Sequence, residues 1–229
     1  MKRFIKTIYV VLILPLIMFS CSKKGNTPLS NLSGLSIVNA SPSFEKLDVY
    51  VDNTKVTGDI DFTFGSKIDY LSVYSGTRQM TLTKKGQTSP LKQESFILEP
   101  QFGYTLFVVD QLASVKFLLL PDNLTKPAKG MASIRFANLS PDSEPLTLSI
   151  EGAPSYLITN ISFKEHSNPM EIETGDKVSF HIREHRTGQL VAVLPDVKVE
   201  EGKIYTIYVK GLKSAVDETR LSAAMYTHK

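Results

Sequence analysis

The sequence predicts an all-β protein built from two tandem β-sandwich domains. Apolar and polar residues alternate in several short segments, and a period of two is typical of half-buried strands. Turn-forming residues separate the segments at intervals of about ten residues, a spacing typical of β-sandwiches. The second half of the sequence also resembles the first. After residue 21, no window of about twelve residues carries a helical apolar stripe.

Five segments show the strand pattern clearly. Residues 47–52 read L-D-V-Y-V-D, and residues 178–183 read V-S-F-H-I-R. The other three segments, rich in β-branched, aromatic or alternating apolar residues, are 104–109, 146–150 and 204–209. The N-A-S-P run at 39–42 marks the exit of the first strand, because Pro stops ladder pairing while Asn and Ser cap turns.

An internal repeat sets the number of domains. With a shift of 99 residues, N-A-S-P at 39–42 falls on N-L-S-P at 138–141. Under the same shift, the apolar positions of 47–51 fall on those of 146–150. Solenoid units run only about 20–50 residues, so this longer repeat indicates duplication of a whole domain.

The chain therefore divides into five predicted parts. They are a lipoprotein signal peptide at 1–21, a flexible tether at 22–33, a first β-sandwich domain at 34–121, a linker at 122–130 and a second β-sandwich domain at 131–229. Two prolines, a glycine and several polar residues around 121–130 indicate the linker.

Cys21 is the only cysteine, and it stands where an apolar leader ends. Residues 1–6 carry three cations and no acid, and residues 7–19 are uncharged and mostly apolar. This layout resembles a bacterial lipoprotein signal, in which the cysteine is lipidated and becomes the mature N-terminus. An uncleaved membrane helix is an alternative, but such a helix needs about 20 apolar residues. A cleaved signal with an incidental Cys21 is another.

Lipidation of Cys21 would place the protein in the bacterial cell envelope, anchored to a membrane by its N-terminal lipid. Lys23 and Lys24 follow the cysteine, whereas some surface-exported lipoproteins carry acidic residues there. By that resemblance we expect attachment to the outer membrane, with the periplasmic face favoured over the cell surface.

The charge of the mature chain argues against a nucleic-acid partner. The formal charge of +3 comes from Lys2, Arg3 and Lys6 in the leader. Removing these three from the 26 basic residues leaves 23, equal to the 23 acidic residues. A neutral chain lacks the one-signed field that drives phosphate binding.

Residues 181–185 spell H-x-x-E-H, which resembles an inverted zinc-protease motif. That chemistry needs a helix, so that both histidines share one face. The period of two around it predicts a strand instead, where the two Cα atoms would lie about 13 Å apart. We therefore predict a solvent-facing polar edge that carries no metal and no catalytic residue.

The five aspartates between residues 48 and 69 are the other candidate cation ligands, since calcium prefers carboxylate oxygens. They lack the spacing of a calcium loop, and alternation places Asp48 and Asp52 on a solvent face. We predict no metal and no cofactor here either.

A family resemblance rests on three motifs. These are N-A-S-P at 39–42, D-V-Y-V-D at 48–52 and Y-x-x-V-x-x-G at 70–76. Together they resemble the bacterial extracytoplasmic domain of unknown function 4397 family. The resemblance covers 34–120 well. Residues 131–229 keep N-L-S-P-D at 138–142 and Gly175, but T-L-S-I replaces the D-V-Y-V core, which indicates a divergent second copy.

This resemblance implies immunoglobulin-like sandwiches of a kind often found in surface or periplasmic lipoproteins, and it supplies no catalytic residues. We therefore expect a non-enzymatic envelope lipoprotein that binds a protein or a glycan. No ligand-binding residue can be assigned from the sequence. The alternative is an envelope hydrolase on the second domain, with His181 or His166 gathered beside acidic residues.

Overall fold

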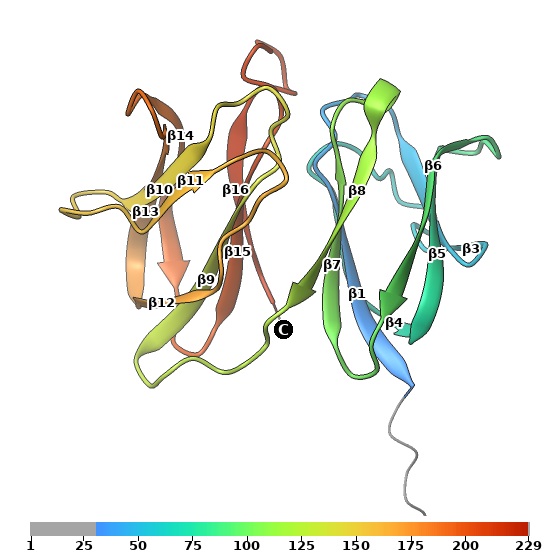
Figure 1. Cartoon of the computed structure of the whole chain (residues 1–229), viewed down its shortest axis with the longest axis horizontal. Helices are drawn as coiled ribbons and strands as arrows, with labels where there is room; N and C mark the ends of the chain where they lie inside the picture. The colour runs from blue at the N-terminus through green and yellow to red at the C-terminus, as the bar shows by residue number, and fades with distance from the viewer. Residues whose placement is uncertain (1–30, 229) are drawn as a thin grey trace, which may run out of the picture.

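The structure is a computed structural model that describes residues 31–228, and over that range it is all-β, as predicted (Figure 1). Cys21, the predicted leader and most of the predicted tether lie outside the described residues. One short 3₁₀ helix, Leu112–Ser114, accompanies the strands. The strands are β1 Leu32–Asn39, β2 Leu47–Val51, β3 Thr54–Lys55, β4 Lys67–Tyr74, β5 Gly76–Lys84, β6 Pro90–Leu98, β7 Gly103–Val109, β8 Lys116–Asp122, β9 Met131–Asn138, β10 Leu146–Ile150, β11 Ile158–Ile161, β12 Met170–Glu173, β13 Gly175–Glu184, β14 Leu190–Val199, β15 Ile204–Lys210 and β16 Ser222–Thr227.

The strands form four sheets in a sandwich-like arrangement. In the N-terminal half, strands β1 to β8 make the sheets β4-β1-β7-β8 and β3-β2-β5-β6. In the C-terminal half, strands β9 to β16 make the sheets β12-β9-β15-β16 and β11-β10-β13-β14. Each order in one half has its counterpart in the other. Both halves also contain one parallel pair, β1 with β7 and β9 with β15.

The four sheets are stacked in layers. One apolar cluster fills the space between the two sheets of each half. A third cluster joins the halves, because β4-β1-β7-β8 packs face to face against β12-β9-β15-β16 (Figure 1). We call the contact between these two inner sheets the seam. Its apolar members are Val38, Ala40, Phe107, Val109, Leu120, Ala137, Leu139, Tyr208 and Tyr226.

The seam buries the inner strands on both faces. Every residue of β7 is buried, and so is all of β9 except Met131. Alternation alone predicts half-buried strands, so the second buried face of these two strands is a finding of the structure. The inner sheets therefore sit in the middle of the molecule, with apolar packing on both sides.

The N-A-S-P run ends β1 in a turn, as predicted, and the N-L-S-P run ends β9 in the same way. The Asn39 carboxamide oxygen accepts the Ser41 N–H at 3.1 Å, and Asn138 accepts the Ser140 N–H at the same distance. These turns are buried, because Ala40 and Leu139 enter the seam. The repeated motif thus shapes the contact between the halves.

Candidate functional site

A buried ion pair crosses the seam. Arg135 on β9 donates from Nη2 to Oδ1 of Asp122, the last residue of β8, at 2.9 Å. The side chains are 6% and 0% exposed. Arg135 also donates from Nη1 to the Pro121 carbonyl oxygen at 2.8 Å. A buried pair is held well only when further hydrogen bonds satisfy its remaining groups, and the neighbouring residues supply most of them.

His228 completes this polar network. Its Nε2 lies 2.9 Å from the Thr206 hydroxyl, and its Nδ1 lies 2.8 Å from the Tyr70 hydroxyl. Tyr70 in turn donates to Asp122 Oδ2 at 2.6 Å. A neutral imidazole protonated on Nδ1 satisfies both ring nitrogens, because Nδ1 then donates to Tyr70 while Thr206 donates to Nε2 and accepts from Arg135 Nε at 3.3 Å. Each group then donates to the next, in the order Arg135, Thr206, His228, Tyr70 and Asp122.

The network also sets which forms of its titratable groups are stable. Burial lowers the pKa of His228 to about 4, and the positive charges of Arg135 and Lys67 add to this against the opposing effect of Asp122. Burial and the Asp122 carboxylate raise the pKa of Tyr70 above its ordinary value. The imidazole and the phenol therefore stay uncharged at neutral pH.

Thr206, His228 and Asp122 resemble a nucleophile, a base and an orienting acid. His228 Nδ1 lies 3.7 Å from Asp122 Oδ2, in addition to its contact with Thr206. However, Thr206 is fully buried between the sheets and already accepts hydrogen bonds from Arg135. A nucleophile must reach substrate, and an imidazole with so low a pKa is a weak base at neutral pH. The arrangement is structural.

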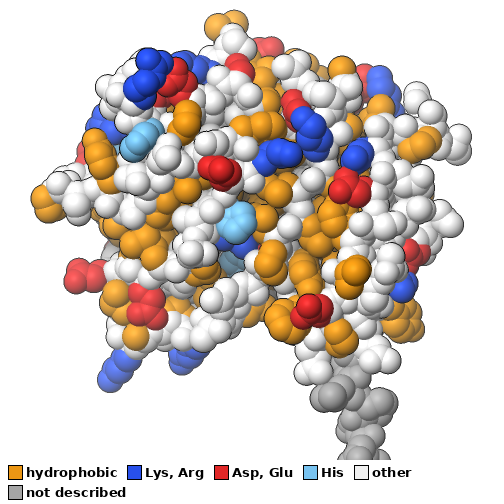
Figure 2. Space-filling view, in the orientation of Figure 1, with side chains coloured by type: hydrophobic (Ala, Val, Ile, Leu, Met, Phe, Trp, Pro, Cys, Tyr) orange, Lys and Arg blue, Asp and Glu red, His pale blue; other side chains and the backbone are white. Residues whose placement is uncertain are grey.

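A groove opens where the seam meets solvent at one end. Its larger hollow is about 590 Å³, within the range of small-molecule sites. A second hollow of about 410 Å³ shares Gln101, Phe102, Gly103 and Leu124 with it. We call the two together the seam groove. Figure 2 shows a histidine and a basic side chain near the middle of this face, where the halves meet. The larger hollow is lined by Gln101, Phe102, Gly103, Pro121, Asp122, Asn123, Leu124, Thr125, Arg135, His166, Ser167, Asn168 and Pro169.

The groove combines an apolar platform with uncharged polar groups. The Phe102 side chain is 51% exposed, and Leu124 lies beside it in both hollows. The side-chain amides of Gln101 and Asn168 are exposed and make no hydrogen bond within residues 31–228. The two charged groups among the lining residues, Asp122 and Arg135, neutralise each other. The groove therefore offers an apolar surface and free hydrogen-bonding amides, with its two opposite charges already paired.

The histidines proposed for a hydrolase are not brought together. His166 lies at the rim of the seam groove, where its Nδ1 contacts the Ser167 carbonyl oxygen. His181 lies on β13 in the outer sheet, 3.7 Å from the exposed Glu151 carboxylate. His166 shares the open groove with one acid, Asp122, whose carboxylate is already paired with Arg135, and the partner of His181 is an exposed carboxylate.

The H-x-x-E-H segment is a strand, as its period predicts, because His181 to Glu184 belong to β13. The expectation of a solvent-facing edge is wrong for Glu184, which is buried. It pairs with Lys213 and accepts from Thr187 at 2.8 Å, and these contacts lower the pKa of Glu184. Lys213 belongs to the loop after β15. The strand pattern around Glu184 does not predict that this loop brings a lysine to the Glu184 carboxylate.

The aspartate cluster is dispersed among lysines and arginines. Asp48 is fully buried, so its predicted solvent-facing position is wrong. Burial favours its neutral form, yet the Gly86 N–H and the Lys55 ammonium at 3.0 Å lower its pKa overall. Lys46 and Lys85 bind Asp61 and lower its pKa to about 2. Within residues 31–228, no group of three His, Cys, Asp or Glu side chains could hold a metal ion.

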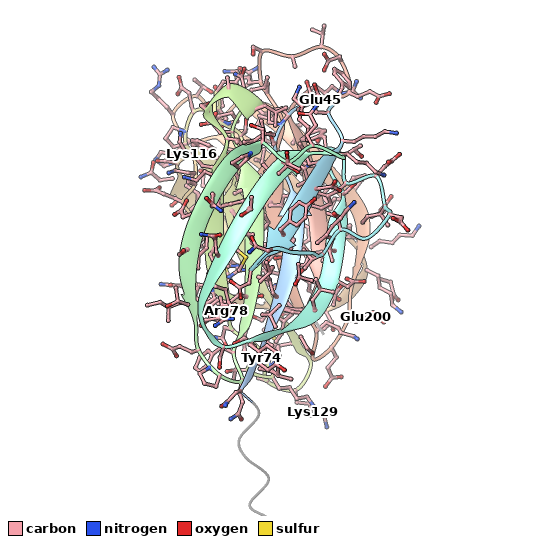
Figure 3. All side chains as sticks on the ribbon, turned by 90° about the vertical axis from the view of Figure 1, so that its right-hand side faces the viewer. Glu45, Tyr74, Arg78, Lys116, Lys129 and Glu200 are labelled. Carbon is pink, nitrogen blue, oxygen red and sulfur yellow. The ribbon has the colours of Figure 1, made fainter. Side chains whose placement is uncertain are left out.

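A separate hollow of about 560 Å³ lies between β4 and the β2–β3 hairpin. Tyr74, which is 71% exposed, and Arg78 line it, and Figure 3 shows both near the end where the chain enters the first strand. Arg78 pairs with Asp52 at 2.6 Å, and Lys55 pairs with Asp48. The two cationic side chains of this hollow therefore already form ion pairs with carboxylates of the protein.

Few features of the sequence mark the residues that build the buried network and the groove. Asp122 falls at the first position of the predicted linker, yet it ends β8. Arg135 is one charged residue within the otherwise uncharged strand β9, and that is the signal that could have marked it. His228 lies beyond the last predicted strand. Phe102 sits in a turn, where an exposed ring is unremarkable.

Residues 33–149 match the family described as a domain of unknown function, DUF4397. The chain belongs to this family. The matched span is more than half of the 229 residues and runs from β1 into β10, past the N-terminal half. It therefore supports the predicted DUF4397 membership without delimiting a second copy. No curated protein matches this DUF4397 chain.

Solved structures similar to this DUF4397 protein resemble it only weakly. A carbohydrate-binding module of family 26 from Eubacterium rectale, in complex with maltoheptaose, is 13% identical with a TM-score of 0.28, covering 86% of this chain and 96% of the module. An α-glucan-binding streptococcal virulence factor is 12% identical with a TM-score of 0.27, covering 86% and 97%. The fimbrial anchor protein Mfa2 from Porphyromonas gingivalis is 7% identical with a TM-score of 0.21, covering 86% and 97%. At these TM-scores the likenesses support no inference about function.

Residues 31–228 include no helix with the length and apolar character needed to cross a membrane.

Proposed function

We propose that this protein is a non-catalytic binding protein of the bacterial cell envelope, and that its partner binds in the seam groove. The observation that carries the proposal is the chemistry of the groove. It offers an exposed ring and two amides that have no hydrogen-bond partner among residues 31–228, while its charged residues, Asp122 and Arg135, are already paired. Rigid sheets hold such loops in place, a common arrangement in binding proteins.

We propose further that the two halves are tandem immunoglobulin-like domains at 34–121 and 131–229, joined by a linker at 122–130. The matching strand orders and the matching parallel pairs of the two halves support this. The shared turn geometry at Asn39 and Asn138 also supports it. On this proposal the groove exists only because two copies of one module meet.

The membrane anchor is a proposal about Cys21, which would be lipidated and hold the protein at the outer membrane, on its periplasmic face. The basic and apolar leader before Cys21 supports it. Replacing the cysteine in Cys21→Ser is expected to abolish palmitate labelling and to release the protein from the membrane fraction. Unchanged labelling would refute the assignment.

The binding role can be tested with the full-length acylated protein as bait in envelope extracts, followed by mass spectrometry of what co-purifies. The variant Phe102→Ala removes the exposed ring of the groove. Its matched control is Phe44→Ala, because Phe44 is 67% exposed and lies outside the groove. We expect capture to fall with Phe102→Ala only. Equal capture by the wild type and both variants contradicts a role for the groove.

A further inference from the structure

The chemistry of the seam groove is specific enough to name a class of ligand. We infer that the groove binds a neutral carbohydrate chain, with the Phe102 ring as the platform and the amides of Gln101 and Asn168 as the hydrogen-bonding groups. This inference rests on the proposed binding role and names its ligand.

The first argument is charge. Arg135 and Asp122 are the lining residues with opposite full charges, and they form one ion pair at 2.9 Å in the floor of the groove. An anionic ligand would be repelled by the Asp122 carboxylate, which already neutralises the Arg135 guanidinium. A cationic ligand would be repelled by that guanidinium. A neutral ligand avoids both conflicts and leaves the pair intact.

The second argument is the supply of hydrogen-bonding groups. Gln101 and Asn168 each carry an amide that can donate and accept, and neither is bonded within residues 31–228. Arg135 has five N–H groups, and four of these serve Thr206, Asp122 and the Pro121 carbonyl. The second N–H of Nη1 has no acceptor among the described residues. A hydroxyl-rich ligand can satisfy all three residues.

The third argument is the exposed ring. Phe102 is half exposed at the point where the two hollows meet, and Leu124 and Pro169 extend the apolar surface around it. Sugar rings present one face of C–H groups and an edge of hydroxyls. Such a ring fits a surface that has an aromatic face in the middle and amides at its border. A ligand without polar groups, such as an acyl chain, would offer no hydrogen-bond partner to the amides or to the Arg135 N–H.

The shape indicates a chain rather than a single sugar. Hollows of about 590 and 410 Å³ share Phe102, so a ligand that fills both must pass over the ring. The groove is open to solvent along the end of the seam, and no described residue closes it like a lid.

The experiment is isothermal titration of the full chain, purified in detergent, with neutral oligosaccharides. The panel is maltohexaose, cellohexaose, mannohexaose and xylohexaose, with hexagalacturonate as the anionic comparison. We expect at least one neutral member to bind and hexagalacturonate not to bind. Phe102→Ala should weaken binding about tenfold, and Asn168→Ala about fivefold. Phe44→Ala should leave the affinity unchanged, because its exposed ring lies elsewhere.

Two results would overturn the inference. One is that no neutral oligosaccharide binds at millimolar concentration. The other is binding that Phe102→Ala does not weaken. If the groove instead retains an uncharged apolar peptide, or an envelope protein whose capture depends on Phe102, the carbohydrate class is wrong while the proposed binding role stands. If neither sugar nor protein responds to groove variants, both fail.

Discussion

Arg135 and Asp122 carry opposite charges on side chains that are only 6% and 0% exposed. Truncating one partner leaves the other buried and unpaired, which is far more harmful than removing an exposed pair. We therefore predict that Arg135→Ala lowers the free energy of unfolding by about 3–5 kcal/mol, measured by urea denaturation at neutral pH.

The matched control for that prediction is Arg186→Ala. Arg186 also pairs with a carboxylate, that of Glu144, but its side chain is 75% exposed. Exposed pairs contribute little, so the urea midpoint should hardly move. A similar loss in both variants would show that the burial of Arg135 is not what makes it important.

His228 makes the stability depend on pH. Its pKa is about 4 in the folded chain against an ordinary value of 6.5, so the unfolded chain binds the extra proton first. The contribution is complete above about pH 6.5 and is lost as the pH falls toward about 4, by about 3 kcal/mol.

Urea unfolding at neutral pH and near pH 4 measures this loss directly. In His228→Gln the step between these two values should shrink, because no imidazole is left to titrate. A wild-type stability that stays flat from pH 7 to pH 4 would show that the network accommodates a charged imidazole.

At the scale of single elements, one tight turn depends on glycine. Gly211 follows β15 with φ 88°, and a Cβ there would lie 2.4 Å from the Arg220 carbonyl oxygen. Gly86, with φ 75°, has open space around the same position. We predict that Gly211→Ala lowers the melting temperature much more than Gly86→Ala, whose cost is about 1 kcal/mol of backbone strain. Equal shifts in calorimetry would contradict the crowding.

The strands themselves could be read from the sequence where one face is apolar and the other polar. The predicted strand 146–150 has the same bounds as β10. The predicted strand 47–52 is one residue longer than β2, which ends at Val51 because Asp52 belongs to the following turn. The same rule fails for β7, where G-Y-T-L-F-V-V is buried throughout. A strand that packs on both faces loses its alternation, and only the position of the other half reveals why.

At the scale of the molecule, the seam should make the two halves unfold together. Phe107, Tyr208 and Tyr226 pack as a triangle of rings whose centroids lie 5.8–6.4 Å apart. We predict a single cooperative transition in the wild type, with equal calorimetric and van't Hoff enthalpies. Phe107→Asp buries an unpaired carboxylate there and should split the transition in two.

Phe44→Asp is the control for that prediction, since the exposed Phe44 ring lies outside the seam. It should leave one transition. Two transitions in the wild type would show that the halves fold independently despite their contact.

The candidate site could not be predicted from the sequence, because it is formed where the two halves meet. Its floor joins Asp122 from one half to Arg135 from the other, and its rim adds Phe102 and His166. A repeat predicts that two similar bodies exist, but it does not say which faces meet. The prediction of a binding protein without catalytic residues therefore stays a prediction, and the seam groove gives it a place to be tested.

The first residues of β1 lie beside the seam groove. Leu32 and Ser33, at the start of β1, line its second hollow, close to where residues 1–30 join the described part (Figure 1). About ten residues separate Asn31 from Cys21, and a fully stretched chain of that length spans at most ~35 Å. An acyl chain on Cys21 would thus keep the mouth of the groove within that distance of the bilayer, in reach of ligands at the membrane surface.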